Sequence, residues 1–165
     1  MPPLHKGGPA QPTRNGKMII FSAVKLKELF EKERDYPWRK PEGCPCCSSH
    51  RLWGHGFAEA IFDGYNRPLL LKLYRCPDCG CVIRLRPKGY FKRFQALVAT
   101  IRSSITLKST SNRWLAGISR SRQGHWIRAL KKRIEAYLTQ TWVEGVVAGF
   151  DTLLQLGQIP VSRSI

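Results

Sequence analysis

Two short stretches hold all six cysteines of this 165-residue chain, and they constrain its fold more than any other feature. The segment from Cys44 to Cys47 reads CPCC and the segment from Cys76 to Cys81 reads CPDCGC, with 28 residues between them. Four thiolates at this spacing can close a tetrahedron around Zn²⁺, because each turn presents two sulfurs to the same side of the metal. The sequence therefore predicts one structural zinc ion bound by Cys44, Cys47, Cys76 and Cys79.

The residues around these motifs support a metal-binding turn at each one. Pro45 and Pro77 stiffen the two turns, and Gly80 allows the backbone to bend back after the second. A β ribbon this small has little core, so a bound ion would supply part of its folding free energy. A closed four-sulfur site leaves no coordination position for water, and we therefore expect no catalysis by the metal.

Disulfides and a thioredoxin-like redox site are the alternatives to a metal site. Disulfides form in oxidising compartments, and the sequence shows no export signal. A redox CxxC motif belongs in a βαβ pattern, whereas these two motifs lie in a segment punctuated by Gly and Pro. Cys46 and Cys81 are left over, and either can replace a neighbour in the metal shell. His50 and His55 are expected to be strand or loop residues rather than ligands.

Hydrophobic patterning predicts an α+β chain, in which a small β zinc ribbon is followed by an α-helical helix-turn-helix bundle. The predicted strands are Leu52–Phe62, Leu69–Tyr74 and Val82–Leu85. Trp53, Phe57 and Phe62 are expected to form the apolar face of the ribbon, with base stacking as the less favoured role. Helices are predicted over residues 18–35 and 90–102, the latter followed by a polar loop from Ser103 to Ser109.

The segment from Asn112 to Leu138 predicts a helix-turn-helix. Ser111 is expected to cap a short first helix, Gly117 to form the turn and Ser119 to cap the second helix. The apolar residues of that second helix recur at intervals of three and four, which predicts a buried face made of Ile127, Leu130, Ile134 and Leu138. Gln123 and Trp126 lie near this buried side. Its opposite face would enter the major groove of DNA with Ser121, Arg122, His125, Arg128 and Lys132. Further nucleic-acid contacts are expected from Arg113, Arg120, Lys88, Lys92 and Arg93.

Charge is distributed unevenly along the chain, whose formal net charge is +17. Residues 79–134 contain fourteen Lys or Arg and no Asp or Glu. A solvated surface normally mixes both signs, because like charges repel one another. A polyanionic partner is therefore predicted, with DNA favoured over RNA. A membrane surface is not expected, since no long amphipathic helix with a clean apolar face is evident.

The predicted domain organisation follows these features along the chain. It comprises a flexible basic tail (1–17), an N-terminal helix and linker (18–43), the zinc ribbon (44–89), the helix-turn-helix (90–138) and a C-terminal helix and tail (139–165). The last segment carries a helical apolar stripe interrupted by Gly145 and Gly149, and is expected to pack on the preceding helices. Self-association, or docking of a protein partner, is the alternative role of that stripe. No membrane-spanning segment is evident, which predicts a soluble cytoplasmic protein.

From Cys44 to about Leu138 the chain resembles the zinc-ribbon plus helix-turn-helix module of bacterial insertion-sequence transposases and their small stand-alone relatives. The residues that carry the resemblance are CPCCS (44–48), LWGHG (52–56), RCPDCGC (75–81), LRP (85–87) and GIS (117–119). The resemblance implies binding of transposon-end or related DNA, a structural zinc ion and association with the bacterial nucleoid.

Transposase catalysis needs carboxylates that converge from different elements on divalent metal ions. Beyond the predicted recognition helix only Glu135, Glu144 and Asp151 remain, and they are expected on a helix. The chain is therefore predicted not to be an enzyme. Two other binding functions stay open, a ribonucleoprotein subunit that binds RNA and a protein–protein adaptor.

Overall fold

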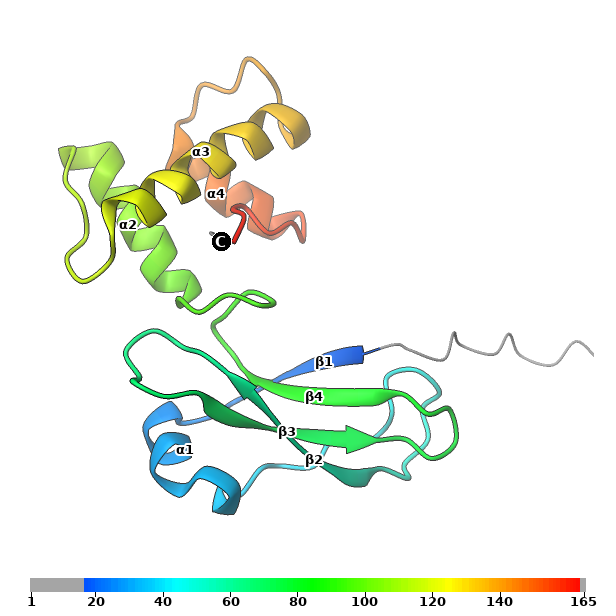
Figure 1. The fold of residues 1–165 in the computed structure, drawn as a ribbon. Helices are drawn as coiled ribbons and strands as arrows, with labels where there is room; N and C mark the ends of the chain where they lie inside the picture. The colour runs from blue at the N-terminus through cyan, green and yellow to red at the C-terminus, as the bar shows by residue number, and fades with distance from the viewer. Residues whose placement is uncertain (1–16, 164–165) are drawn as a thin grey trace, which may run out of the picture. The chain divides into compact units, whose positions relative to one another are not determined.

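A computed structural model describes residues 17–163 and divides the chain into two compact units, with the boundary along the chain between Lys88 and Gly89 (Figure 1). The chain is of mixed α+β class, with the described strands in the first unit and the three longer helices in the second. The predicted flexible tail lies outside the described residues, except for Lys17, which begins the first strand. No helix in the described part of the chain is long and apolar enough to cross a membrane.

The first unit is built on a four-stranded sheet in the order β1-β4-β3-β2. Its strands are β1 (Lys17–Ser22), β2 (Trp53–Ala60), β3 (Leu69–Arg75) and β4 (Val82–Pro87). The pairs β2–β3 and β3–β4 are antiparallel, and β1 runs parallel to β4 at the edge. The three strands predicted between residues 52 and 85 are therefore confirmed, with small changes at their ends.

The helix predicted over residues 18–35 is wrong in its first half. Residues 17–22 form β1, and the helix α1 is confined to Leu26–Lys32, followed by the short 3-10 helix η1 (Glu33–Asp35). The β-branched pair in MIIF suits a strand, and Lys17 pairs with Val82, a residue 65 positions away. Helix α1 buries Leu29 and contacts β3 (Figure 1).

The prediction that Trp53 packs in the apolar face of the ribbon is wrong, because its side chain is 62% exposed. Strand β2 contains one extra residue between Gly54 and Phe57, a β-bulge that breaks the alternation of its side chains. Trp53 therefore pairs with exposed Arg75, whereas Phe57 is half-buried opposite Lys72. Phe62 is buried, as predicted.

The second unit packs three helices around one apolar core. They are α2 (Val98–Ser111), α3 (Arg120–Tyr137) and α4 (Val146–Gln155). Trp126 and Leu130 of α3 meet Phe150 and Leu153 of α4, which confirms that the C-terminal segment packs on the preceding helices. At Gly149 the two helices approach so closely that an added Cβ would lie 2.4 Å from Ile134 Cδ1.

The predicted boundaries before α3 need correction. The helix expected over residues 90–102 begins only at Val98, because the preceding residues fold back through a bridge between Tyr90 and Leu97. The expected polar loop 103–109 is helical, because Ile101 and Ile105, four positions apart, both pack in the core of the second unit. Hydroxyls in this stretch bond to carbonyls of the preceding turn, as Thr106 does to Arg102 O, and are satisfied within the helix.

The short helix expected after Ser111 is absent from the described chain, and residues 112–119 connect α2 to α3. Ser111 lies at the end of α2 instead, where its hydroxyl donates to Leu107 O, and Asn112 ends the helix in the left-handed conformation. The predicted N-cap of the next helix is confirmed, because Ser119 Oγ accepts a hydrogen bond from Arg122 N at 3.3 Å.

Candidate functional sites

Cys44, Cys47, Cys76 and Cys79 come together, with their sulfur atoms all within 4.8 Å of one another. Cys44 Sγ lies 3.6 Å from Cys79 Sγ, and Cys47 Sγ lies 3.5 Å from Cys76 Sγ. Metal–sulfur bonds of about 2.3 Å in a tetrahedron separate neighbouring sulfurs by about 3.8 Å, close to both distances. The four cysteines predicted from their spacing are thus positioned to bind a metal ion.

The two cysteine turns share one backbone geometry. Ser48 N donates to Cys44 O at 2.8 Å, and Gly80 N donates to Cys76 O at 2.9 Å. Both donors lie four residues after the first cysteine of their turn and have positive φ angles, 61° for Ser48 and 72° for Gly80. The sequence indicated this bend at Gly80 only, because serine carries no signal for the left-handed conformation.

A polar bridge outside the sulfur cluster joins the same two turns. Asp78, from the second turn, accepts hydrogen bonds from Ser49 Oγ and from the guanidinium of Arg51. These hydrogen bonds, that of Arg51 first, lower the pKa of Asp78 below its usual value, so the carboxylate is charged at neutral pH. Sequence reasoning missed this bridge, since the residues of the pair are 27 positions apart.

The cysteine thiols differ strongly in acidity before any metal binds. Burial opposes ionisation of Cys44, but hydrogen bonds from the backbone of Cys47 and Cys46 outweigh it and lower the pKa of Cys44 to about 7. Burial, assisted by hydrogen bonds with neighbouring thiols, raises the pKa of Cys79 to about 12. One thiolate is therefore available near neutral pH, and a cation that binds the cluster would displace protons from the rest.

The leftover cysteines and the histidines are placed differently. Cys46 Sγ lies 2.8 Å from Cys81 Sγ, and these two sulfurs form a second close group with Cys44. Groups of three or more metal-ligating side chains in residues 17–163 consist of cysteines alone. His50 Nδ1 lies 2.9 Å from Glu42 O, and His55 is exposed on β2.

Helix α3 divides into a buried and a polar side. Gln123, Trp126, Leu130 and Ile134 are buried, and Ile127 and Leu138, which were also predicted to face the core, are half-buried against it. On the polar side, the exposed residues predicted to contact bases are Ser121, Arg128 and Lys132.

The side chains of the two other residues predicted to read bases, Arg122 and His125, contact other residues of the second unit. The guanidinium of Arg122 lies over the Trp126 ring, 5.1 Å from its centroid. His125 Nε2 lies 3.0 Å from Ser162 Oγ, so the half-buried imidazole is hydrogen-bonded to the C-terminal segment. The polar face that remains open on α3 is therefore narrower than the sequence predicts.

The remaining predicted contacts fall on both units. Arg113 and Arg120 are exposed next to the start of α3, and Lys92 and Arg93 are exposed in the segment before α2. Lys88 is the last residue of the first unit.

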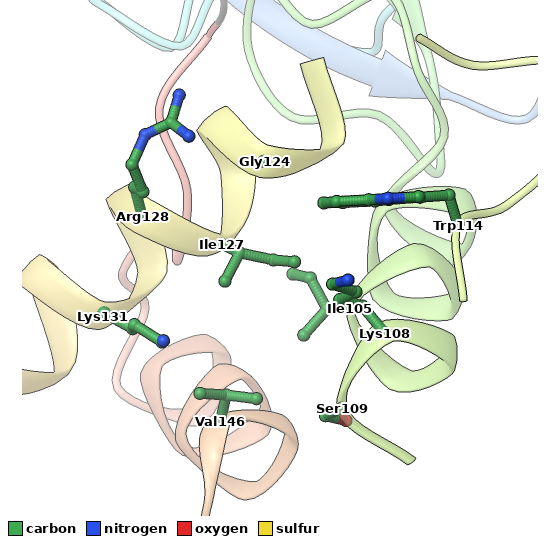
Figure 2. Close-up of a pocket in the computed structure, with 9 residues that line it drawn as sticks. All are labelled: Ile105, Lys108, Ser109, Trp114, Gly124, Ile127, Arg128, Lys131 and Val146. Atoms are coloured by element: carbon green, nitrogen blue, oxygen red, sulfur yellow. The ribbon is translucent and has the colours of Figure 1, made fainter. Parts of the chain in front are cut away.

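A cavity of about 460 Å³ lies between α2, the connecting residues and α3 (Figure 2). Its lining includes three cations, Lys108, Arg128 and Lys131, and no acidic side chain. Lys108 Nζ lies 4.2 Å from the centroid of the Trp114 ring, a cation–π contact at one end of the cavity. Figure 2 shows Lys131 and Val146 across the cavity from Trp114 and Lys108.

A buried glutamine holds the connecting residues against α3. Gln123 Nε2 donates to Leu115 O at 2.9 Å and to Ile118 O at 2.8 Å. Gln123 Oε1 accepts from Leu115 N at 2.9 Å and from Ser104 Oγ of α2 at 2.7 Å. One amide thus makes four hydrogen bonds and fixes the loop that carries Trp114.

Sequence reasoning missed Lys108, Trp114 and Lys131 as parts of one cavity. The signal that could have found them is the absence of acids over residues 79–134, but the pattern does not say which cations converge. The three acids expected on one helix lie apart: Glu135 is on α3, Glu144 precedes α4 and Asp151 is on α4.

Comparison with protein-family models, curated proteins and solved structures finds no match for this chain.

Proposed function

We propose that this chain is a zinc-containing nucleic-acid-binding protein that binds double-stranded DNA through the basic surface of its second unit. The observation that carries this proposal is the cavity between α2 and α3, where three cations and an indole meet without an acid in the lining. Lys and Arg side chains bind phosphate oxygens, and an aromatic ring adds a surface for a sugar or base.

In this proposal α2, the connecting residues 112–119 and α3 act as a helix-turn-helix. The buried residues of α3 hold it to its scaffold, and Gly117 has a positive φ of 80° in the connection. Ser121, Arg128 and Lys132 would face the major groove, where Arg can bind guanine with two hydrogen bonds. The resemblance to transposase modules supports DNA of mobile elements as the target class.

Zinc is the proposed metal, because four thiolates in a tetrahedron favour Zn²⁺ over cations that prefer oxygen ligands. Held by Cys44, Cys47, Cys76 and Cys79, the ion would tie the two turns of the first unit together. When bound it supplies structure rather than chemistry, since four sulfurs fill its coordination sphere. Elemental analysis of the purified chain is expected to find one zinc per molecule.

A salt titration tests the DNA proposal on random duplexes and on duplexes selected for binding. Affinity is expected to fall steeply with salt, and the selected duplexes should bind more tightly at every salt concentration. The double variant Arg128→Ala/Lys132→Ala should weaken binding of the selected duplexes, and loss of a phosphate contact of Lys132 should reduce the magnitude of the slope of log affinity against log salt by about 1. The matched control Lys25→Ala/Lys27→Ala changes two exposed cations of the first unit and should change the slope less.

Two results would refute the proposal. Equal affinity for random and selected duplexes would remove sequence recognition by α3. If the magnitude of the salt slope decreases equally in the double variant and in its control, the DNA contacts do not lie on α3.

One observation favours a second candidate function, binding of single-stranded RNA by the first unit. Trp53 is 62% exposed and lines a hollow of about 440 Å³ together with His55 and Arg75. An open indole next to a cation is a typical stacking platform for unpaired bases. Competition between a single-stranded RNA and duplex DNA separates the two functions, because Trp53→Ala should weaken only RNA binding.

A further inference from the structure

The sulfur pair of Cys46 and Cys81 differs from the other cysteine pairs in its spacing. Cys46 comes from the first cysteine turn, and Cys81 follows the second turn and leads into β4. Their sulfurs are 2.8 Å apart. Two sulfur pairs among Cys44, Cys47, Cys76 and Cys79, here called the metal quartet, are separated by 3.5 and 3.6 Å. The two spacings indicate two different kinds of site.

A distance of 2.8 Å is too short for two sulfurs that bind the same metal ion. Two ligands of a tetrahedral zinc–thiolate site lie about 3.8 Å apart, and ligands of a planar three-sulfur site lie further apart still. A second ion at this position would also have to share Cys44 with the quartet. The close approach suits instead a pair that can bond covalently, for which the S–S length is about 2.05 Å.

Exposure gives the two sulfurs different roles. Cys46 is exposed, so a reagent in solution can reach its sulfur. Cys81 is only 6% exposed and packs in the core of the first unit with Ile83 and Leu85. A reagent therefore meets Cys46 first, and Cys81 lies within reach to complete the reaction.

We propose that Cys46 and Cys81 form a reversible modification site, an oxidisable dithiol that reacts with low-molecular-weight disulfides while the quartet keeps its metal. The Cys46 sulfur attacks one sulfur of the reagent, and the first reagent thiol leaves with the proton. The Cys81 sulfur then attacks Cys46 Sγ, forms the protein disulfide and releases the second reagent thiol with its proton. Two electrons pass from the protein dithiol to the reagent disulfide.

The cross-link would join the two cysteine turns a second time. It closes a loop between positions 46 and 81 without using any of the four quartet sulfurs. The turns would then stay together after a chelator has removed the metal, which the reduced chain cannot achieve with its quartet alone. The Cys46–Cys81 site thus links the two cysteine turns of the first unit under oxidising conditions, whether or not a metal is bound.

The test uses the full-length, zinc-loaded chain incubated with oxidised glutathione. The product is denatured in chelator with N-ethylmaleimide and weighed by intact mass spectrometry. Reduced protein should carry six maleimide groups and oxidised protein four, with a Cys46–Cys81 cross-link in the peptide map. Zinc measured before denaturation should stay at one per chain.

Cys46→Ser and Cys81→Ala serve as matched variants, and each should abolish the loss of two labels while keeping one zinc. Because Cys81 is buried, the wild-type peptide map decides the question even if Cys81→Ala folds poorly. Three results would overturn the proposal: a cross-link within the quartet with release of zinc, six labels after oxidation, or a glutathione adduct that stays on Cys46. Loss of zinc from Cys46→Ser would also overturn it, since Cys46 would then be a metal ligand.

Discussion

Replacing Gln123 with leucine should destabilise the second unit more than any single hydrogen bond can explain. The side chain is fully buried and makes four hydrogen bonds, which join α2, the connecting residues and α3. Leucine has a similar volume, so the change removes the polar contacts without opening a large cavity. The partner groups left behind belong to Ser104, Leu115 and Ile118.

Each of the four lost hydrogen bonds is worth about 1 kcal/mol net, so the unfolding free energy should fall by about 3–4 kcal/mol. With a urea dependence of about 1.5 kcal/mol per molar, the unfolding midpoint shifts down by about 2–3 M. The helices of the second unit dominate circular dichroism at 222 nm, which reports the transition in the full-length chain. Ser104→Ala removes one of the four bonds and should cost about 1 kcal/mol.

The comparison between Gln123→Leu and Ser104→Ala tests whether the Gln123 amide holds the connecting residues against α3. If Gln123→Leu costs no more than Ser104→Ala, the amide does not hold the connecting residues and the reasoning fails. DNA affinity gives a second readout, because a loosened connection would displace Trp114 from the cavity lining. At a urea concentration where both proteins are folded, Gln123→Leu should bind random duplexes more weakly than Ser104→Ala.

Three further predictions concern the metal quartet, a close helix contact and an ion pair. Cys79→Ser should lose stoichiometric zinc and the β-sheet signal of the first unit, as measured by elemental analysis and circular dichroism, and retained zinc would contradict the quartet. Gly149→Ala should cost about 1–2 kcal/mol in urea unfolding, because overpacking against Ile134 outweighs the better helix propensity of alanine. Gly124→Ala is its control in α3 and should not destabilise, since only a flexible side-chain end must move. Asp151→Asn should cost at most about 1 kcal/mol at pH 7, because both partners of its ion pair with α2 are partly exposed. That hydrogen-bonded pair lowers the pKa of Asp151, so its contribution is present above the unfolded value of about 3.9 and is lost as pH falls through the lowered pKa. The wild type and Asp151→Asn should therefore converge in urea stability in acid, and a constant difference would refute the assignment.

Features encoded within a few residues could be predicted from the sequence. The metal quartet follows from two CxxC turns, because each turn alone sets the spacing of its two sulfurs. The cap at Ser119 and the buried 3–4 spacing of Leu130 and Ile134 are equally local, since they depend on one helix and its first turn. The α+β class and the strands between Trp53 and Pro87 follow from the same short-range patterns.

Features that depend on partners far along the chain could not be predicted from the sequence. Residues 17–22 are a strand because β4, about 65 positions later, offers an unpaired edge. Trp53 is exposed because a bulge changes the face on which it lies. The polar stretch 103–109 is helical because Ile105 packs with residues of α3 and α4 in the core of the second unit.

The sequence by itself determined which cysteines can hold a metal ion and where the charge of the chain accumulates. Only the tertiary structure decided which cations line one cavity, that Gln123 holds the loop beside it, and that Cys46 meets Cys81. The physical reason is distance along the chain. Turns, caps and helical faces are set by neighbours within about four positions. Cavities, buried amides and sulfur pairs form only when packing brings remote segments together.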